Sequence, residues 1–387
     1  MKQSKIGVTS ITIIINKLEK ETFYLKKQTS VPQSDVFAEA LLQRRIRTTF
    51  SEDIHTQIHL KKVLITGAGG SIGSEICRQV YALHPAEIIL VGHGENSIYM
   101  IQHELMNLTN QAIKITAEIQ EIQDKKGIRR LMEKIQPDFV FHAAAHKHVP
   151  LMQNNPHSAV ANNIIGTKNV AEVAGEVGVE TFVLVSTDKA VEPQNVMGAS
   201  KRIAEMIVAH LNHKYETNYT TVRFGNVLAS RGSVVPLFLK QIDQGGPLTL
   251  TDSEMTRYFM TIEEAASLVV KAGTMTTGGD IFVLNMGDAV KIKDIAKRLI
   301  TMSGKQNIAI QYTGIRDGEK LHEGLLEVDE RIQMEETEEM FIGKAIVAPE
   351  CQIDYLLINY EMLSKEALTV ELLKITNRNE VQIPMEV

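Results

Sequence analysis

Residues 63–73 read VLITGAGGSIG, an apolar run that passes directly into a cluster of glycines. A buried parallel strand has this apolar character, and glycines after it permit a tight turn into a helix. Gly67, Gly70 and Gly73 have a spacing typical of dinucleotide-binding turns, where a helix N-terminus faces a pyrophosphate. The strand–turn–helix context favours cofactor binding over a turn that only closes the packing. The cofactor candidates here are Gly67, Gly69, Gly70, Ser71, Ile72 and Gly73.

Outward from this stretch, short β-branched runs alternate with amphipathic helical patterns as far as residue 225. The expected strands are Val63–Thr66, Glu87–Val91, Ile113–Ala117, Phe139–His142, Thr181–Ser186 and Thr220–Phe224. The expected helices are Ser71–Leu83, Ser97–Asn107, Lys125–Ile135, Pro156–Val177 and Val196–His213. Such alternation predicts an α/β doubly wound parallel sheet, the Rossmann arrangement, with helices on both faces.

The alternation ends after Gly225, where loops rich in Gly, Pro and Arg follow. A helix near Ile262–Ala272, a strand at Ile281–Leu284 and a helix at Lys291–Met302 are expected beyond them. We predict four parts: an N-terminal extension of uncertain fold (1–60), a dinucleotide-binding domain (61–225, completed by parts of 281–302), a smaller discontinuous substrate-binding lobe (226–345) and a C-terminal tail segment (346–387).

The composition of the 387 residues is that of a globular protein, with 44% hydrophobic and 23% charged residues. A net charge of −6 argues against nucleic-acid binding. Cys77 and Cys351 form neither a disulfide framework nor a metal-binding pattern, so we expect a reduced, cytoplasmic protein without a metal. The apolar run Ile6–Ile15 is about half the roughly 20 residues that a membrane span needs, and it lacks an export signal.

The second expected strand ends without the carboxylate that usually binds a cofactor ribose. The segment Gly92–Glu95 leaves room for a 2′-phosphate that His93 could face, whereas Glu95 could hold the ribose of NAD. We therefore expect NAD(P), with the choice between NAD and NADP open. The further cofactor candidates are His93, Glu118 beyond the third strand, and the small residues Ala143 and Ala144 after the fourth.

The stretch Ser186–Lys201, STDKAVEPQNVMGASK, carries the candidate reaction site. Nicotinamide oxidoreductases of the short-chain type usually have Tyr four residues before the Lys, but Met197 stands at that place before Lys201. A thioether has no proton to give, so acid–base chemistry must come from other groups. Asp188 and Lys189 are the candidates, and an elimination on a bound nicotinamide is favoured over a plain dehydrogenation. The alternative is a purely structural ion pair.

Polar residues after the fourth and sixth strands are candidates for binding substrate. His146 and Lys147 crowd one turn, although such a turn can also be a solvated loop. Arg231 and Arg257 suit bidentate phosphate binding, although either one alone could be a surface charge. The substrate-binding candidates are His146, Lys147, Asn226, Arg231, Ser233, Arg257 and Glu319.

Seven blocks of sequence follow one another in a specific order. They are TGAGGSIGSE (66–75), GHGENSIY (92–99), HAAAHKHVPLM (142–152), STDKAVEPQNVMGASKR (186–202), RFGNVLASRGSV (223–234), MTRYFMT (255–261) and GEKLHE (318–323). Together they resemble the CapD-like bacterial polysaccharide-biosynthesis group of nucleotide-sugar 4,6-dehydratases, in the extended short-chain dehydrogenase/reductase superfamily. The resemblance covers roughly residues 41–345. Longer relatives carry membrane helices and another domain before this core, and neither is expected here.

The resemblance implies a UDP-N-acetylglucosamine substrate, a tightly bound and recycled nicotinamide, and a homo-oligomer. It implies oxidation at sugar carbon 4, loss of water across carbons 5 and 6, and return of hydride to carbon 6. Lys189 is then the expected base at carbon 5 and Asp188 the acid for the departing hydroxyl. Thr187 would hold the carbon 4 oxygen, and Lys201 would position the nicotinamide ribose.

Two alternatives remain at this point. One is a nucleotide-sugar epimerase or reductase of the same fold, although such epimerases normally keep the Tyr that Met197 replaces. The other is a catalytically inactive NAD(P)-binding assembly protein. Asp188, Lys189 and Lys201 stand together with the Arg-containing blocks, which an inactive site need not keep.

Overall fold

A computed structural model describes residues 33–46, 52–108, 113–331, 335–336, 339–347 and 350–377. It contains a nine-stranded sheet in the order β14-β15-β11-β6-β5-β4-β1-β2-β3. Its strands are β1 (Lys62–Thr66), β2 (Glu87–Gly92), β3 (Lys114–Ile119), β4 (Phe139–His142), β5 (Thr181–Val185), β6 (Asn218–Arg223), β11 (Asp280–Leu284), β14 (Glu335–Glu336) and β15 (Met340–Lys344). The strands from β11 to β3 run parallel, whereas β15 and β14 are antiparallel additions at one edge. The expected α/β doubly wound fold is confirmed.

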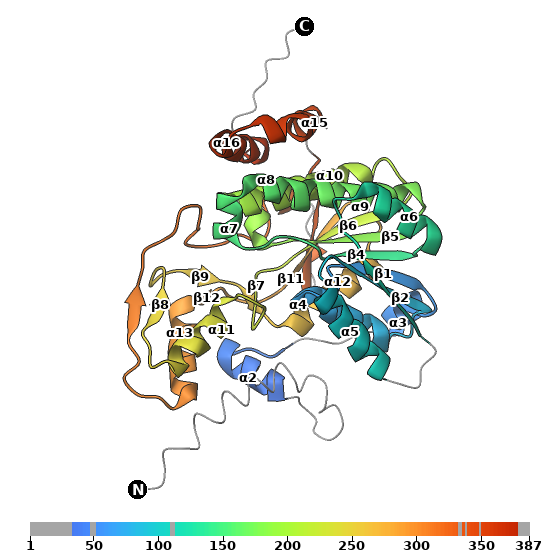
Figure 1. Ribbon diagram of the computed structural model, residues 1–387. Coiled ribbons are helices and arrows are strands. Elements are labelled where there is room, and N and C mark those ends of the chain that lie inside the picture. Colours follow the sequence, from blue (N-terminus) through green and yellow to red (C-terminus); the bar gives the residue numbers. More distant parts are fainter. Residues whose placement is uncertain are drawn as a thin grey trace.

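Helices cover both faces of this sheet (Figure 1). One face packs against α3 (Glu52–Ile58), α4 (Ser71–Ala82), α5 (Glu95–Asn107) and α12 (Ile262–Met275). The other packs against α6 (Lys125–Ile135), α8 (Pro156–Ala159), α9 (Thr167–Glu176) and α10 (Val196–Leu211). Successive strand residues point to opposite faces, so in β1 Val63 and Ile65 join the first apolar cluster and Leu64 the second. Both faces are therefore buried, as the apolar strand sequences require.

The helix expected over Pro156–Val177 is interrupted. A π-helical segment, Val160–Gly166, separates α8 from α9, and the short helix α7 (Val149–Asn154) precedes them. Segments of this type occur frequently at functional sites. Here Asn163 accepts a hydrogen bond from the backbone N–H of His146 at 2.8 Å and donates to its carbonyl at 3.0 Å. The segment thereby fixes the loop that follows β4.

The smaller lobe is built around a separate apolar cluster. Its elements are α11 (Val234–Asp243), β8 (Leu248–Leu250), β9 (Thr256–Arg257), β12 (Val290–Lys291), α13 (Ile292–Ser303) and β13 (Ile310–Tyr312). Helix α2 (Gln33–Leu42) adds Ala38, Leu41 and Leu42 to this cluster, so part of the N-terminal extension folds onto the lobe. By contrast, α12, β11 and β15 belong to the main sheet and its covering layer. The chain thus passes between the two units more than once, and the expected domain boundaries remain a prediction.

The C-terminal segment forms α15 (Glu350–Asn359) and α16 (Lys365–Thr376). Leu368 and Leu372 of α16 pack in the same apolar cluster as α10, which lies beneath it in Figure 1. Among the helices that the structure describes, none has the length and apolar character to cross a membrane. The run Ile6–Ile15 lies outside the described residues.

Candidate active site

The glycine-rich turn between β1 and α4 is packed too closely for side chains. Gly67 has a φ of 66°, and a Cβ atom there would lie 2.8 Å from the backbone of Ala143. A Cβ atom on Gly73 would lie 2.1 Å from the carbonyl oxygen of Gly67. This close approach leaves the N-terminus of α4 directly at the turn, where its N–H groups and dipole favour a bound anion.

Two adjoining cavities lie beyond this turn. The larger, about 610 Å³, crosses the C-terminal ends of the parallel strands, where open α/β sheets bind their ligands. Its lining includes Gly70–Gly73, Ala143, His146–His148, Val185–Thr187, Met197, Lys201 and Ser230–Val235. The smaller, about 470 Å³, lies between the main sheet and the lobe. Lys189, Asn226 and Gly232–Val234 line both cavities, and we call this shared boundary the seam.

Lys201 has the environment of a ligand-binding cation. Its side chain is buried at the larger cavity, and within the described residues its Nζ has no hydrogen-bond partner. Burial lowers the pKa of Lys201 to about 8, against the opposing charge of Glu205. A buried ammonium without acceptors is costly unless a ligand supplies oxygens. Together with the glycine turn, it fits a dinucleotide whose ribose hydroxyls reach Nζ.

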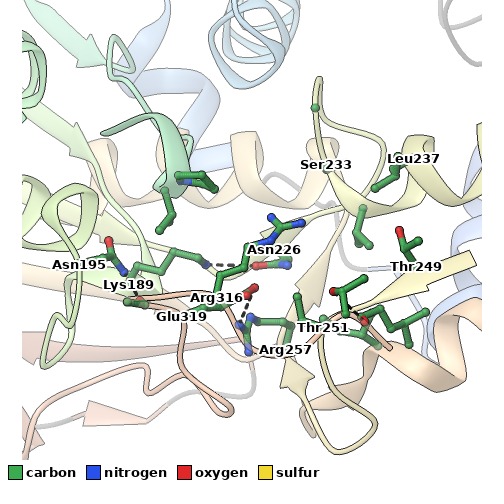
Figure 2. A pocket seen from close by; sticks show the side chains of 18 of the residues that line it. Lys189, Asn195, Asn226, Ser233, Leu237, Thr249, Thr251, Arg257, Arg316 and Glu319 are labelled. Carbon is green, nitrogen blue, oxygen red and sulfur yellow. Dashed lines mark hydrogen bonds and ion pairs between the residues drawn. The ribbon is translucent and has the colours of Figure 1, made fainter. Parts of the chain in front are cut away.

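The backbone turns two residues after the end of β5, at the candidate acid–base pair. Thr187 is extended, and residues 188–190 form a 3₁₀ turn. Asp188 Oδ1 accepts hydrogen bonds from Thr187 Oγ1 at 2.9 Å and from Lys189 Nζ at 2.8 Å. Lys189 Nζ also donates to Asn226 Oδ1 at 3.3 Å, as Figure 2 shows. Lys189 therefore lies at the seam, whereas Asp188 is fully buried behind it and lines neither cavity.

Met197 lines the larger cavity and is buried, so its position relative to Lys201 places a thioether where the usual oxidoreductase has a phenol. Within the lining of this cavity, Lys201, Lys189 and Thr187 also carry transferable protons. Met197 therefore shares one cavity with all the other candidate catalytic residues except Asp188.

The two arginines expected to bind phosphate lie in different places. Arg231 lines the larger cavity, and its backbone N–H donates to Ser71 Oγ at 3.3 Å. Arg257 is buried at the smaller cavity, and its guanidinium donates to the carbonyls of Thr256, Lys320 and Leu321. Arg257 therefore holds the segment after residue 318 in place by hydrogen bonds and also lines the cavity.

Four of the remaining candidates line a cavity, and two line neither. His146 and Lys147 line the larger one, although they were expected to bind substrate. Burial and the charge of Arg231 lower the pKa of Lys147. Ser233 lines both cavities, and Glu319 lines the smaller. His93 and Glu118 line neither; His93 is exposed near Glu121, and Glu118 lies 4.0 Å from Lys134.

Two residues of the smaller cavity were missed. Arg316 lines it near Lys189 and Asn226 (Figure 2), and Glu323 lines it with a side chain only 3% exposed. Glu323 belongs to the quoted block GEKLHE, so its position in that block was the available signal. Arg316 stands two residues before the block in an irregular loop, where no periodicity marks it.

A network of buried charges lies behind the reaction site. Glu205 of α10 accepts hydrogen bonds from Ser186, Arg202 and Arg223. Glu330, in the short helix α14 (Val328–Arg331), accepts from both arginines. Burial alone would raise the pKa of Glu330, but the hydrogen bonds and charge of Arg223 lower it to about 2. The network ties the segment that returns from the lobe to the strands that carry the site.

The sequence profile of the family described as polysaccharide biosynthesis protein matches residues 63–345. This range contains the whole lining of both cavities. The chain belongs to the polysaccharide biosynthesis protein family.

Curated members of the family are similar over most of this chain. The probable polysaccharide biosynthesis protein EpsC of Bacillus subtilis is 55% identical over 314 residues, covering 81% of this chain and 52% of EpsC. The capsular polysaccharide biosynthesis protein CapD of Staphylococcus aureus is 53% identical over 331 residues, covering 84% and 54%. The chain thus spans about half the length of these two relatives. A UDP-N-acetylglucosamine 4,6-dehydratase (inverting) of Campylobacter jejuni is 35% identical over 275 residues, covering 70% and 78%.

Solved structures agree with the fold. Pen from Bacillus thuringiensis matches with a TM-score of 0.69 at 33% identity, covering 78% of this chain and 98% of Pen. The dTDP-glucose 4,6-dehydratase DesIV from Streptomyces venezuelae, with NAD and TYD bound, has a TM-score of 0.59 at 20% identity and covers 70% and 90%. The chain is a CapD/EpsC-like member of the nucleotide-sugar dehydratase and epimerase family.

Proposed function

We propose that this chain is a nucleotide-sugar 4,6-dehydratase that converts UDP-N-acetylglucosamine to a UDP-4-keto-6-deoxy-N-acetylhexosamine for polysaccharide or glycan biosynthesis. The observation that carries the proposal is the hydrogen bond between Asp188 and Lys189, whose amine lies at the seam, in a site with Met197 in place of a phenol. Loss of water needs an acid and a base close together, and this pair supplies both. The name of the Campylobacter jejuni relative supports the substrate.

A nicotinamide bound in the larger cavity would accept a hydride from sugar carbon 4 and return it to carbon 6. The turn Gly67–Gly73 and the N-terminus of α4 would hold the pyrophosphate, and Lys201 would hold the nicotinamide ribose. The NAD in DesIV supports a nicotinamide cofactor without deciding between NAD and NADP. His93 and Glu118 remain proposals for the adenine-side ribose.

The chain's own groups move the protons. Once carbon 4 is a ketone, the hydrogen on carbon 5 becomes acidic and Lys189 removes it. Asp188 gives a proton to the hydroxyl on carbon 6, which departs as water. Because Asp188 lies behind Lys189, a small rotation about the 188–190 turn must bring its carboxyl to the seam. Thr187 Oγ1, which lines the larger cavity, would hold the carbon 4 oxygen.

The smaller cavity would hold the UDP group. Arg316 and Arg257 are the cations in its lining besides Lys189. The guanidinium of Arg257 already donates to backbone carbonyls, so we assign the main diphosphate contact to Arg316, with Arg257 fixing the loop beside it. Asn226 and Ser233, at the seam, would face the sugar.

Incubation of the purified protein with UDP-N-acetylglucosamine tests the proposal. We expect a UDP-sugar lighter by one water in the mass spectrum, with no net accumulation of reduced nicotinamide. A product of unchanged mass but altered configuration would assign the epimerase activity instead. Recovery of unchanged substrate over the whole pH range would contradict the proposed function.

A further inference from the structure

Glu323 is a second carboxyl group close to Lys189, in addition to Asp188. Its Oε1 lies 3.8 Å from Lys189 Nζ and 3.9 Å from Arg257 Nε, and its Oε2 lies 3.9 Å from Lys320 Nζ. Among the residues that the structure describes, Asp188 and Glu323 are the carboxylates within 4.0 Å of Lys189 Nζ. One amine at the seam is therefore flanked by two buried carboxyl groups.

Each of the two carboxyl groups has one oxygen that makes no hydrogen bond within the described residues. Asp188 Oδ2 and Glu323 Oε2 are buried, and neither has a hydrogen-bond partner in the described part of the chain. Burial raises the pKa of Glu323, the charge of Lys189 opposes this effect, and the charge of Asp188 adds to it. A carboxyl whose pKa is moved toward neutrality can both accept and donate a proton during turnover.

The proposed dehydration needs more proton sites than Asp188 and Lys189 supply. It removes one proton from the carbon 4 hydroxyl and one from carbon 5, and it returns one to the departing hydroxyl and one to carbon 5. At the start Asp188 must be protonated and Lys189 must be a free amine, so the pair has one vacant site. The carbon 4 proton fills that site, and no base would remain for carbon 5.

We infer that Glu323 is the third proton site of this reaction centre and acts through Lys189; the inference rests on the proposed function. Lys189 takes the carbon 4 hydroxyl proton and passes it to the Glu323 carboxylate, so an N–H bond breaks and an O–H bond forms. The freed amine then takes the carbon 5 proton, while Asp188 gives its proton to the departing hydroxyl. After carbon 6 is reduced, Lys189 returns a proton to carbon 5. Glu323 then restores the Asp188 proton through Lys189, and every group is in its starting state.

The pH profile of kcat for Glu323→Gln separates this role from a structural one. The charged and titratable groups facing Glu323 are Lys189, Asp188, Arg257 and Lys320. For the wild-type chain we expect kcat to fall on the acid side, because Glu323 must begin without the transferred proton. We expect Glu323→Gln to lower kcat by about 10²-fold with a KM within a factor of three, and to move the acid limb to lower pH. Glu323→Asp should recover part of kcat and should move the acid limb back toward its wild-type pH.

Glu327→Gln is the matched control. Glu327 is another partly buried carboxyl of the same segment, but it binds Arg202 and lines neither cavity. Its variant should keep the wild-type acid limb. A Glu323→Gln variant with wild-type kcat, or with reduced kcat and an unmoved acid limb, would overturn the inference while leaving the dehydratase function intact.

Thermal unfolding at two pH values tests the titration of Glu323 without an activity assay. Because the folded protein raises the pKa of Glu323, the wild-type chain loses stability as the pH rises through that value. Glu323→Gln should therefore unfold at a higher temperature than the wild type at pH 8, with the difference vanishing near pH 4. An equal difference at both pH values would contradict a titrating Glu323. Failure of the wild type to release water would count against the proposed function instead.

Discussion

At the scale of single residues, the candidate site has the Met197 thioether at the position of a phenol and the Lys189 amine close to two carboxyl groups. Lys189 reaches the seam because the chain turns soon after β5, and Asn226 meets it from β7 (Asn226–Val227), a short strand that follows β6. These contacts follow from parallel strands whose C-terminal ends share one edge of the sheet. The chemistry of the centre therefore depends on a few side chains at strand ends.

Lys189 and Met197 should respond very differently to substitution. We expect Lys189→Ala to reduce dehydration by at least about 10³-fold, because the base at carbon 5 is gone. Met197→Leu conserves volume and carries no proton chemistry, so kcat should stay within about threefold of the wild type. Product formation measured under substrate saturation checks both. Equal losses in the two variants would refute the assigned roles.

The buried ammonium of Lys201 should lower the free energy of unfolding of the cofactor-free protein and strengthen cofactor binding. Its folded pKa of about 8 lies below the ordinary value, so the buried ammonium costs stability at pH 7, and this cost disappears as the pH rises above 8 toward 10. In cofactor-free protein, Lys201→Met should add roughly 3 kcal/mol to the free energy of unfolding at pH 7 and much less at pH 10. Denaturant titrations of the variant and the wild type at the two pH values measure this difference in the free energy of unfolding.

The exposed Lys240 of α11 gives the control for that experiment. Lys240→Met should change the free energy of unfolding by less than about 0.5 kcal/mol at either pH. A Lys201→Met variant that is less stable than the wild type at pH 7 would show that Lys201 is not an uncompensated cation. Nicotinamide binding should be weakened by Lys201→Met alone.

At the scale of elements, the sequence pattern predicted the bounds of those helices and strands that are set by interactions between residues near in sequence. Strand β4 and helix α6 have the bounds expected from sequence, because one is a short apolar run and the other is strongly amphipathic. The π-helical segment after α8 was not predicted, because one wider turn leaves the apolar spacing nearly unchanged. Helix α2 was not predicted because its apolar partners lie in the lobe, about 200 residues further along the chain.

The same distinction applies to the site. Gly67–Gly73, Lys189 and Lys201 could be found from sequence because a known spacing places them on a strand end or a helix. Glu323 and Arg316 come from an irregular segment, which is held near Lys189 by contacts with Arg257, Val191 and Asn195. Their position depends on tertiary contacts that no short pattern records. The roles assigned to these residues remain predictions.

The glycine turn gives a test at this scale. Gly73→Ala would place a methyl group 2.1 Å from the Gly67 carbonyl oxygen, so α4 must shift away from β1. We expect a stability loss of about 1–3 kcal/mol and at least a tenfold weaker affinity for the dinucleotide. Gly70→Ala, whose Cβ would lie 3.1 Å from the same oxygen at an ordinary φ of −78°, should cost less stability. A Gly73→Ala variant with wild-type stability and affinity would contradict this packing.

At the scale of the whole molecule, the buried charge network holds the segment that returns from the lobe against the main sheet. Glu330 pairs with Arg202 and Arg223, which belong to the main sheet and its covering helix, although Glu330 lies beyond the lobe in sequence. Removing one partner of a buried network leaves uncompensated charge, which typically costs 3–5 kcal/mol. The position of the returning segment thus depends on two buried carboxylates, Glu205 and Glu330, that line neither cavity.

Glu330→Gln should therefore destabilise the protein by about 3 kcal/mol or more at pH 7. Because the folded pKa of Glu330 is about 2, its ionised form stabilises the protein above about pH 4 and this stabilisation is lost as the pH falls toward 2. The difference from the wild type should shrink over that range in denaturant titrations. Equal stability of variant and wild type at pH 7 would mean that the network contributes no net stabilisation.

The transfer of an isotope within the sugar tests the central claim most directly. UDP-N-acetylglucosamine carrying deuterium on carbons 4 and 5, converted in ordinary water and analysed by NMR, should give a product with one deuterium on carbon 6 and a hydrogen from solvent on carbon 5. This result requires one bound nicotinamide that is recycled and a base that exchanges the carbon 5 proton with solvent, the role proposed for Lys189. Deuterium found again on carbon 4, or lost to free reduced nicotinamide, would contradict it.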